Sequence, residues 1–154
     1  MNFDSYATAI REQFKDASDT TKRAIALAAC RVAVTKLIPE DALVRRAIQA
    51  LAAGEYRNRR LIESLERQVE DLDARYFDAQ EACDAGRGDQ QTVHDLFIKA
   101  RAASSVSCAF NPDTTLAMST AVYEACVAVE VPPVKAKISA VITRVPARHS
   151  DERS

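Results

Sequence analysis

The chain has 154 residues, of which 28 are Ala, only 3 are Gly and none is Trp. This length suits one domain of ordinary size, and many Ala with few Gly favour helix. Its 21 Lys and Arg nearly balance its 22 Asp and Glu, leaving a net charge of −1, which argues against general nucleic-acid binding.

Apolar residues recur every third or fourth position and predict about seven helices. The first is expected over 4–15, and the second runs from a cap at Ser18 or Asp19 to about residue 38. Between residues 23 and 36 the only charge is Arg31, so this second helix should be central. The third begins with Pro39 in its first turn and ends at Gly54, unless Gly54 lies inside a continuous helix.

The longest helix is predicted over 55–85, and its apolar residues recur every 3.7 positions or so, which favours packing within the chain over a coiled coil. Another follows over 90–110, and Asn111, Pro112 and Asp113 then serve as cap, first turn and favourable anion. The sixth, to about residue 129, carries Glu124 as its one charge and should be the second central helix. Pro132 and Pro133 break it before a short helix over 134–143.

The sequence therefore predicts an all-α, single-domain bundle of six to seven helices over residues 1–145, with central helices at about 20–38 and 113–129. Strands are poorly supported, because the best candidates lie inside longer helical stretches. A flexible polar tail is expected over 146–154.

No catalytic, cofactor or metal site emerges from the residue pattern, and we expect no enzyme. The only histidines are His94, beside an apolar stripe, and His149, in the tail. The cysteines lack metal-binding spacing and read as buried free thiols in a reducing cytoplasm: Cys30, Cys83, Cys108 and Cys126. A polar N-terminus and short apolar windows predict neither a signal peptide nor a membrane span.

Charge is unevenly distributed along the predicted long helix. Residues 45–60 are rich in Arg and residues 63–84 in Asp and Glu, the reverse of what the helix dipole favours. In one explanation, Arg57, Arg59 and Arg60 pair with acids on neighbouring helices and the acidic stretch is merely solvated. In the other, the acids form a recognition face for a basic partner, with these candidate residues: Glu63, Glu66, Glu70, Asp73, Asp78 and Glu81. A third possibility, nucleic-acid contact by residues 57–60, is weaker because the basic cluster is short and adjoins strong acid.

Several segments resemble the Ala-rich helical immunity proteins of bacterial polymorphic toxin and secretion systems. The segments are RAIALAACRVAVTKLIP, VRRAIQALAAGE, KARAASSVSCAFNPD and AVYEACVAVE, and the likeness spans about residues 20–130. The resemblance implies a cytosolic protein that binds a cognate toxin and blocks it, without assigning contact residues.

The leading hypothesis is thus a non-catalytic inhibitor that occludes a toxin's active site through the exposed face of the 55–85 helix. The small side chains of residues 102–107 offer a second candidate interface. One alternative is a self-associating structural or regulatory protein, a homodimer, which an exposed apolar stripe on the long helix would favour. Another is a small enzyme or ligand carrier, which a deep polar cavity near His94, Tyr123 or Cys108 would favour.

Overall fold

The computed structural model describes residues 2–37 and 41–143, and within those ranges it is all-helical, with seven α-helices and no strand. This confirms the predicted fold class. The expected tail at 146–154 lies outside the described residues. The helices are α1 Phe3–Phe14, α2 Asp19–Ala33, α3 Ala42–Ala53, α4 Arg59–Asp84, α5 Gln90–Cys108, α6 Thr114–Val129 and α7 Val131–Ile142.

Most helices begin where a polar side chain accepts a hydrogen bond from a backbone amide of the first turn. Ser18 caps α2 in this way, whereas Asp19 is already helical. Asp41 accepts from the amide of Val44 at 3.1 Å, so α3 begins at Ala42 and not at the expected Pro39, which lies outside the described residues. The cap of α6 is Asp113 and not Asn111.

Three predicted boundaries were wrong at helix junctions. The α-helical part of α2 ends at Ala33 and continues as a 3₁₀ turn over Val34–Lys36. The first of the two possibilities for Gly54 is confirmed, because it ends α3 at a φ of 78°, but α4 starts only at Arg59 and not at the predicted residue 55. Helix α7 starts at Val131, with both prolines in its first turn, because the break falls at Glu130.

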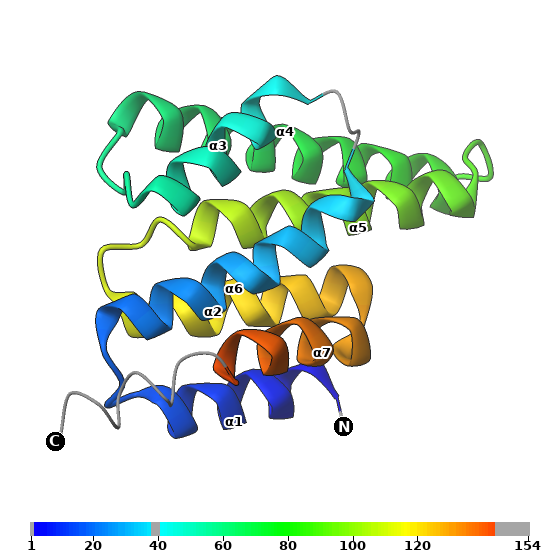
Figure 1. Cartoon of the computed structure of the whole chain (residues 1–154). Coiled ribbons are helices and arrows are strands. Elements are labelled where there is room, and N and C mark those ends of the chain that lie inside the picture. The colour runs from blue at the N-terminus through cyan, green and yellow to red at the C-terminus, as the bar shows by residue number, and fades with distance from the viewer. Residues whose placement is uncertain (1, 38–40, 144–154) are drawn as a thin grey trace, which may run out of the picture.

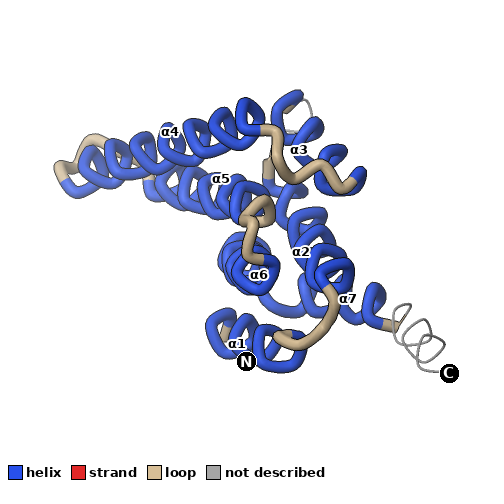
Figure 2. Tube along the Cα trace, turned by 90° about the vertical axis from the view of Figure 1, so that its left-hand side faces the viewer, coloured by secondary structure: helices blue, strands red, loops and turns tan. Residues whose placement is uncertain are grey.

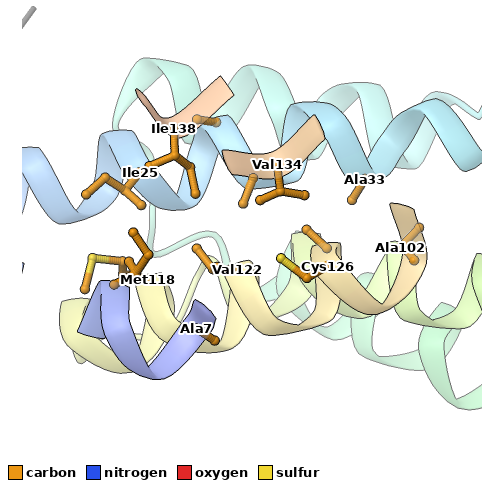
Figure 3. Packing of buried hydrophobic residues seen from close by; sticks show 14 of the residues in the cluster. Ala7, Ile25, Ala33, Ala102, Met118, Val122, Cys126, Val134 and Ile138 are labelled. Atoms are coloured by element: carbon orange, nitrogen blue, oxygen red, sulfur yellow. The ribbon is translucent and has the colours of Figure 1, made fainter. Parts of the chain in front are cut away.

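Helix α6 lies at the centre of the bundle, against α2, α5, α1 and α7 (Figure 2). Its apolar side chains, with those of α2 and α7, form a core in which Ile25, Met118, Val122 and Ile138 are fully buried (Figure 3). The predicted central position of both helices is confirmed. Alanines allow this close packing, and those fully buried on α2 and α6 include Ala29, Ala33, Ala117, Ala121 and Ala125.

Helices α4 and α5 pair as a hairpin that extends past the ends of the other helices (Figures 1 and 2). The predicted apolar stripe of α4 faces α5, and its Leu61, Leu65 and Leu72 are buried. Nearer the hairpin end, Tyr76 and Cys83 are only half-buried. The hairpin turns at 85–89, where the backbone of Gly88 approaches α4 so closely that a Cβ there would lie 2.7 Å from the Cys83 nitrogen.

Candidate functional site

An acidic stripe runs along one flank of α4. We give this name to Glu63, Glu66, Glu70, Asp73, Glu81 and Asp84, which follow one another at helical steps that keep side chains on one face. Phe77 occupies the remaining step, between Asp73 and Glu81. Its ring is 66% exposed, although a large apolar side chain gains most from burial.

Five of the six predicted site residues lie on the stripe, and Asp78 does not. Asp78 is exposed but lies about 100° around the helix from Phe77. Glu66, Glu70 and Glu81 are exposed, and no ion pair engages them among the described residues. Asp73 is different, because it pairs with a neighbouring helix.

Arg101 of α5 joins three helices through two short ion pairs. Its Nη2 donates to Oδ1 of Asp73 on α4 at 2.8 Å, and its Nη1 donates to Oε2 of Glu124 on α6 at 2.8 Å. Glu124, the one charge predicted within the central helix, therefore has a partner, as a largely buried carboxylate requires. The pKa of Glu124 is raised above its ordinary value, mainly by burial of the carboxyl group. The positive charge of Arg101 and a hydrogen bond from Ser104 oppose this rise without cancelling it.

An aromatic hollow opens beside these ion pairs, with a volume of about 470 Å³. We use this name for the space between α4, α5 and α6 that is lined by the rings of Tyr76, Phe77, Phe97 and Tyr123, together with Val127, Asp73, Arg101 and Glu124. Tyr76 contacts both phenylalanines, with ring centroids 5.2 Å from Phe77 and 5.5 Å from Phe97. The hollow thus joins aromatic surface to two carboxylates and one guanidinium.

A second hollow, of about 430 Å³, lies toward the start of α4 and is bordered by Arg59, Ile62 and Glu66 on α4 and by Cys108 on α5. The acidic stripe therefore borders both hollows. It provides a ridge with recesses beside it instead of a flat surface.

The arginines at the start of α4 do not pair with acids on neighbouring helices, so that part of the first explanation was wrong; its other part, a solvated acidic stretch, remains compatible with the exposed acids of α4. Arg59 lies 4.0 Å from Glu63 on its own helix, and Arg57 and Arg60 make no ion pair with any described residue. A different arginine, Arg23 of α2, donates to the carbonyl of Ala109 at 2.7 Å and stacks over Tyr56 at 4.1 Å. Arg23 thereby fixes the loop that precedes α4.

The other candidate interface, the small side chains of residues 102–107, is used inside the bundle. Ala102, Ala103 and Ser105 are fully buried, and the Ser105 hydroxyl donates to the carbonyl of Ala121 on α6 at 2.8 Å. These small residues let α5 approach α6, as small residues at helix contacts generally do.

The four cysteines differ in burial: two are buried and two are half-buried. Cys30 and Cys126 are buried, as expected, and burial raises the pKa of each thiol to about 12. Cys83 and Cys108 are only half-buried, so the expectation of buried thiols was wrong for them. All four are free cysteines.

The features that would favour the alternatives are sparse in the described part of the chain. Phe77 is a single exposed ring among acids, so α4 presents no apolar stripe to a second copy. His94 is exposed, and Tyr123 and Cys108 border hollows that open to solvent. Among residues 2–37 and 41–143, no group of three His, Cys, Asp or Glu could hold a metal ion. Nor does any helix there combine the length and hydropathy needed to cross a membrane.

Sequence reasoning missed Phe77 and Arg101 as members of the site. Phe77 breaks the pattern, because Tyr76 belongs to the apolar stripe and an aromatic residue directly after it must face elsewhere. Arg101 could have been found from Glu124, since one charge in an otherwise apolar helix needs an opposite charge nearby.

The protein is thus an all-helical bundle with a projecting α4–α5 hairpin, and the aromatic hollow lies between this hairpin and α6, next to the acidic stripe. No protein-family model matches the chain, and comparisons with curated proteins and with solved structures found no significant match.

Proposed function

We propose that this protein is a non-catalytic binding protein that docks a basic partner protein on the acidic stripe of α4. The observation that carries the proposal is the exposed Phe77 in the middle of that stripe. Acids alone are common on solvated helices, and a single exposed ring is ordinary as well. Phe77, however, lines the aromatic hollow together with Tyr76 and Phe97, and interface hot spots concentrate in such recesses.

The charge pattern supports a partner of opposite sign. Glu66, Glu70 and Glu81 remain free of ion pairs among the described residues, so their charges are available to a partner. Complementary charges of this kind accelerate association and orient the two proteins. The hairpin extends past the ends of the other helices (Figure 1), and the acidic stripe continues to its end at Glu81 and Asp84, which are exposed.

Toxin neutralisation is the role we propose within this class. A basic toxin domain that acts on nucleic acid would present a groove of suitable charge, and a ridge of acids could enter and block it. The same proposal places the protein in the cytoplasm, where free thiols stay reduced. Blocking a groove in this way requires only that the acidic stripe be exposed, and it needs no catalytic group.

A charge-reversal experiment tests the proposal. The test variant is Glu66→Lys with Glu70→Lys and Glu81→Lys, and Asp73 is left intact because it holds Arg101. The probe is an inactivated toxin-like domain encoded beside this chain's gene, and stopped-flow fluorescence measures its association rate. We expect the rate to fall about tenfold or more at low salt, and by less at high salt, where charges are screened.

The matched control reverses three acids on or beside α1, at the opposite side of the bundle, as Asp4→Lys, Glu12→Lys and Asp16→Lys (Figure 1). It alters the net charge equally, so a local effect of the stripe separates from a general effect of charge. Equal slowing by both variants, or no complex at micromolar concentration, contradicts the proposal.

A further inference from the structure

The aromatic hollow has the composition of a site for a cation. Four of its lining residues carry aromatic rings, and they come from α4, α5 and α6. A guanidinium stacks favourably on such rings and loses less hydration than an ammonium when it does so. The volume of about 470 Å³ also lies in the range of roughly 300–1,000 Å³ that ligand sites occupy.

The charge balance of the hollow also favours a cation. Asp73 and Glu124 supply two carboxylates, and Arg101 supplies one guanidinium, which leaves one negative charge in excess. The hydrogen bond from Arg101 to Asp73 ends on Oδ1, so Oδ2 of Asp73 is not occupied by that guanidinium. That oxygen is therefore available to a second donor. Glu70 and Glu81, exposed on the same flank of α4, add to the negative potential.

We propose that the aromatic hollow receives one arginine side chain of the basic partner, stacked on Phe77 and hydrogen-bonded to Oδ2 of Asp73. This inference rests on the proposed function, because it names the anchor residue of that partner. It explains why Phe77 is exposed: the ring forms one wall of the recess, and the arriving guanidinium covers it. An arginine at the centre of an interface, in a recess, is a frequent binding hot spot.

The hollow can be tested without the partner. The probe is N-acetyl-L-arginine amide, added to the ¹⁵N-labelled full chain and followed by NMR chemical shifts, with N-acetyl-L-leucine amide and free L-arginine as comparison ligands. We expect saturable shifts at residues 73–77, 97–101 and 123–127, with a Kd on the order of millimolar, since a single small group contributes only a few kcal/mol. The leucine compound should bind at least about fivefold more weakly.

Variants at Phe77 identify the contribution of the ring. Phe77→Leu should weaken binding of the arginine compound about three- to tenfold, and Phe77→Tyr should retain it, because only the latter keeps an aromatic face. Leu116→Ala is the matched control: among the described residues Leu116 is the other exposed large hydrophobic residue, at 40%, and it does not line the hollow. Both positions are exposed, so these changes should leave folding intact.

Three results would overturn the inference: shifts that map elsewhere or fail to saturate, equal or tighter binding of the leucine compound, and unchanged binding by Phe77→Leu. Free L-arginine binding tenfold tighter than the blocked compound would also overturn it, by indicating a metabolite instead of a partner's residue. The outcome is separable from that of the charge reversal, because Glu66, Glu70 and Glu81 do not line the hollow. If the arginine compound does not bind but the charge reversal slows association, the acidic stripe docks the partner without an arginine anchor in the hollow. If the arginine compound binds but the charge reversal has no effect, the docking role of the acidic stripe is rejected.

Discussion

Glu130 is the most strained residue of the described backbone. Its φ of 83° and ψ of 163° lie in a region that is essentially restricted to glycine, and no other non-glycine residue described has a positive φ. The strain is imposed from both sides: the amide of Glu130 closes α6 by donating to Cys126, and the next residue begins α7. The packing of α7 against α2 holds this sharp junction in place.

Glu130→Gly should therefore stabilise the protein. Relief of strain contributes about 1–3 kcal/mol, and the greater freedom of glycine in the unfolded chain offsets about 0.5–1 kcal/mol of it. We expect a net gain of about 1 kcal/mol, seen as a rise in Tm of roughly 2–4 °C by calorimetry. Glu130→Ala removes the same carboxylate without relieving φ and should give no such gain. Equal Tm changes in both variants would show that the backbone strain is not the cause.

The buried thiols make stability depend on alkaline pH. Burial raises the pKa of Cys30 and Cys126 from 9.0 to about 12, so above pH 9 the unfolded chain loses protons that the folded chain retains. The stabilisation is complete below the unfolded pKa and is lost as pH rises toward the folded pKa. Each thiol should reduce the unfolding free energy by about 1 kcal/mol between roughly pH 8 and pH 10.

Cys126→Ala tests this thiol contribution. Between roughly pH 8 and pH 10, the unfolding free energy of the variant should fall by about 1 kcal/mol less than that of the wild type, as measured by urea unfolding at each pH. The cost of the small cavity is the same at both pH values and cancels from the comparison. If the unfolding free energy of Cys126→Ala depends on pH as steeply as that of the wild type, the assignment is contradicted.

At the scale of elements, the Arg101 ion pairs fasten the projecting hairpin to the central helix. Arg101→Met would leave Asp73 and Glu124 as neighbouring carboxylates without a counter-ion, and Glu124 is largely buried. Because breaking one partner of a buried pair is costly, we expect a loss of about 2 kcal/mol near neutral pH, below the fully buried value since Asp73 is partly exposed.

The pH dependence distinguishes lost charge from lost packing in Arg101→Met. Burial already raises the pKa of Glu124, and removal of the arginine should raise it further. A carboxyl whose folded pKa is raised loses stability as pH increases, so the defect should shrink on going from about pH 7 to about pH 5. Urea unfolding at both values checks this. Arg75→Met, which removes a solvent-exposed pair with Asp71, is the control and should cost less than about 0.5 kcal/mol. A pH-independent defect would contradict the charge explanation.

The elements were largely predictable from local pattern, whereas their ends and the site were not. Periodicity identified α4 through the apolar residues that face α5, because those positions repeat over many turns. The ends depended on which of several polar residues became the cap, so Asp41 and Asp113 took over from the expected neighbours. The aromatic hollow joins Phe77, Phe97 and Tyr123 from three helices, and no local pattern in one sequence reports contacts across helices.

For the whole molecule, the projecting hairpin end should be the least stable unit. The outer parts of α4 and α5 pack only on each other, and residues 84–92 are exposed. Segments with few buried apolar contacts open locally at low free energy. Hydrogen-exchange mass spectrometry should therefore find amides of 79–95 exchanging at least about tenfold faster than those of α6.

Gly88→Ala should accelerate exchange at that end further, because its Cβ would lie 2.7 Å from the Cys83 backbone nitrogen. The amides of α6 serve as the internal reference and should be unaffected. Uniform exchange across the chain would instead indicate that the whole bundle opens as one cooperative unit.

The order of charges along α4 creates an electric dipole that runs along the length of this helix. Arginines stand at the helix start, where the aligned peptide groups are already positive, and carboxylates continue to the far end, where they are negative. The side chains therefore reinforce the macrodipole instead of cancelling it. Although the net charge is only −1, a positively charged body approaching in dilute salt would exert a torque that turns the hairpin end toward it before the surfaces touch.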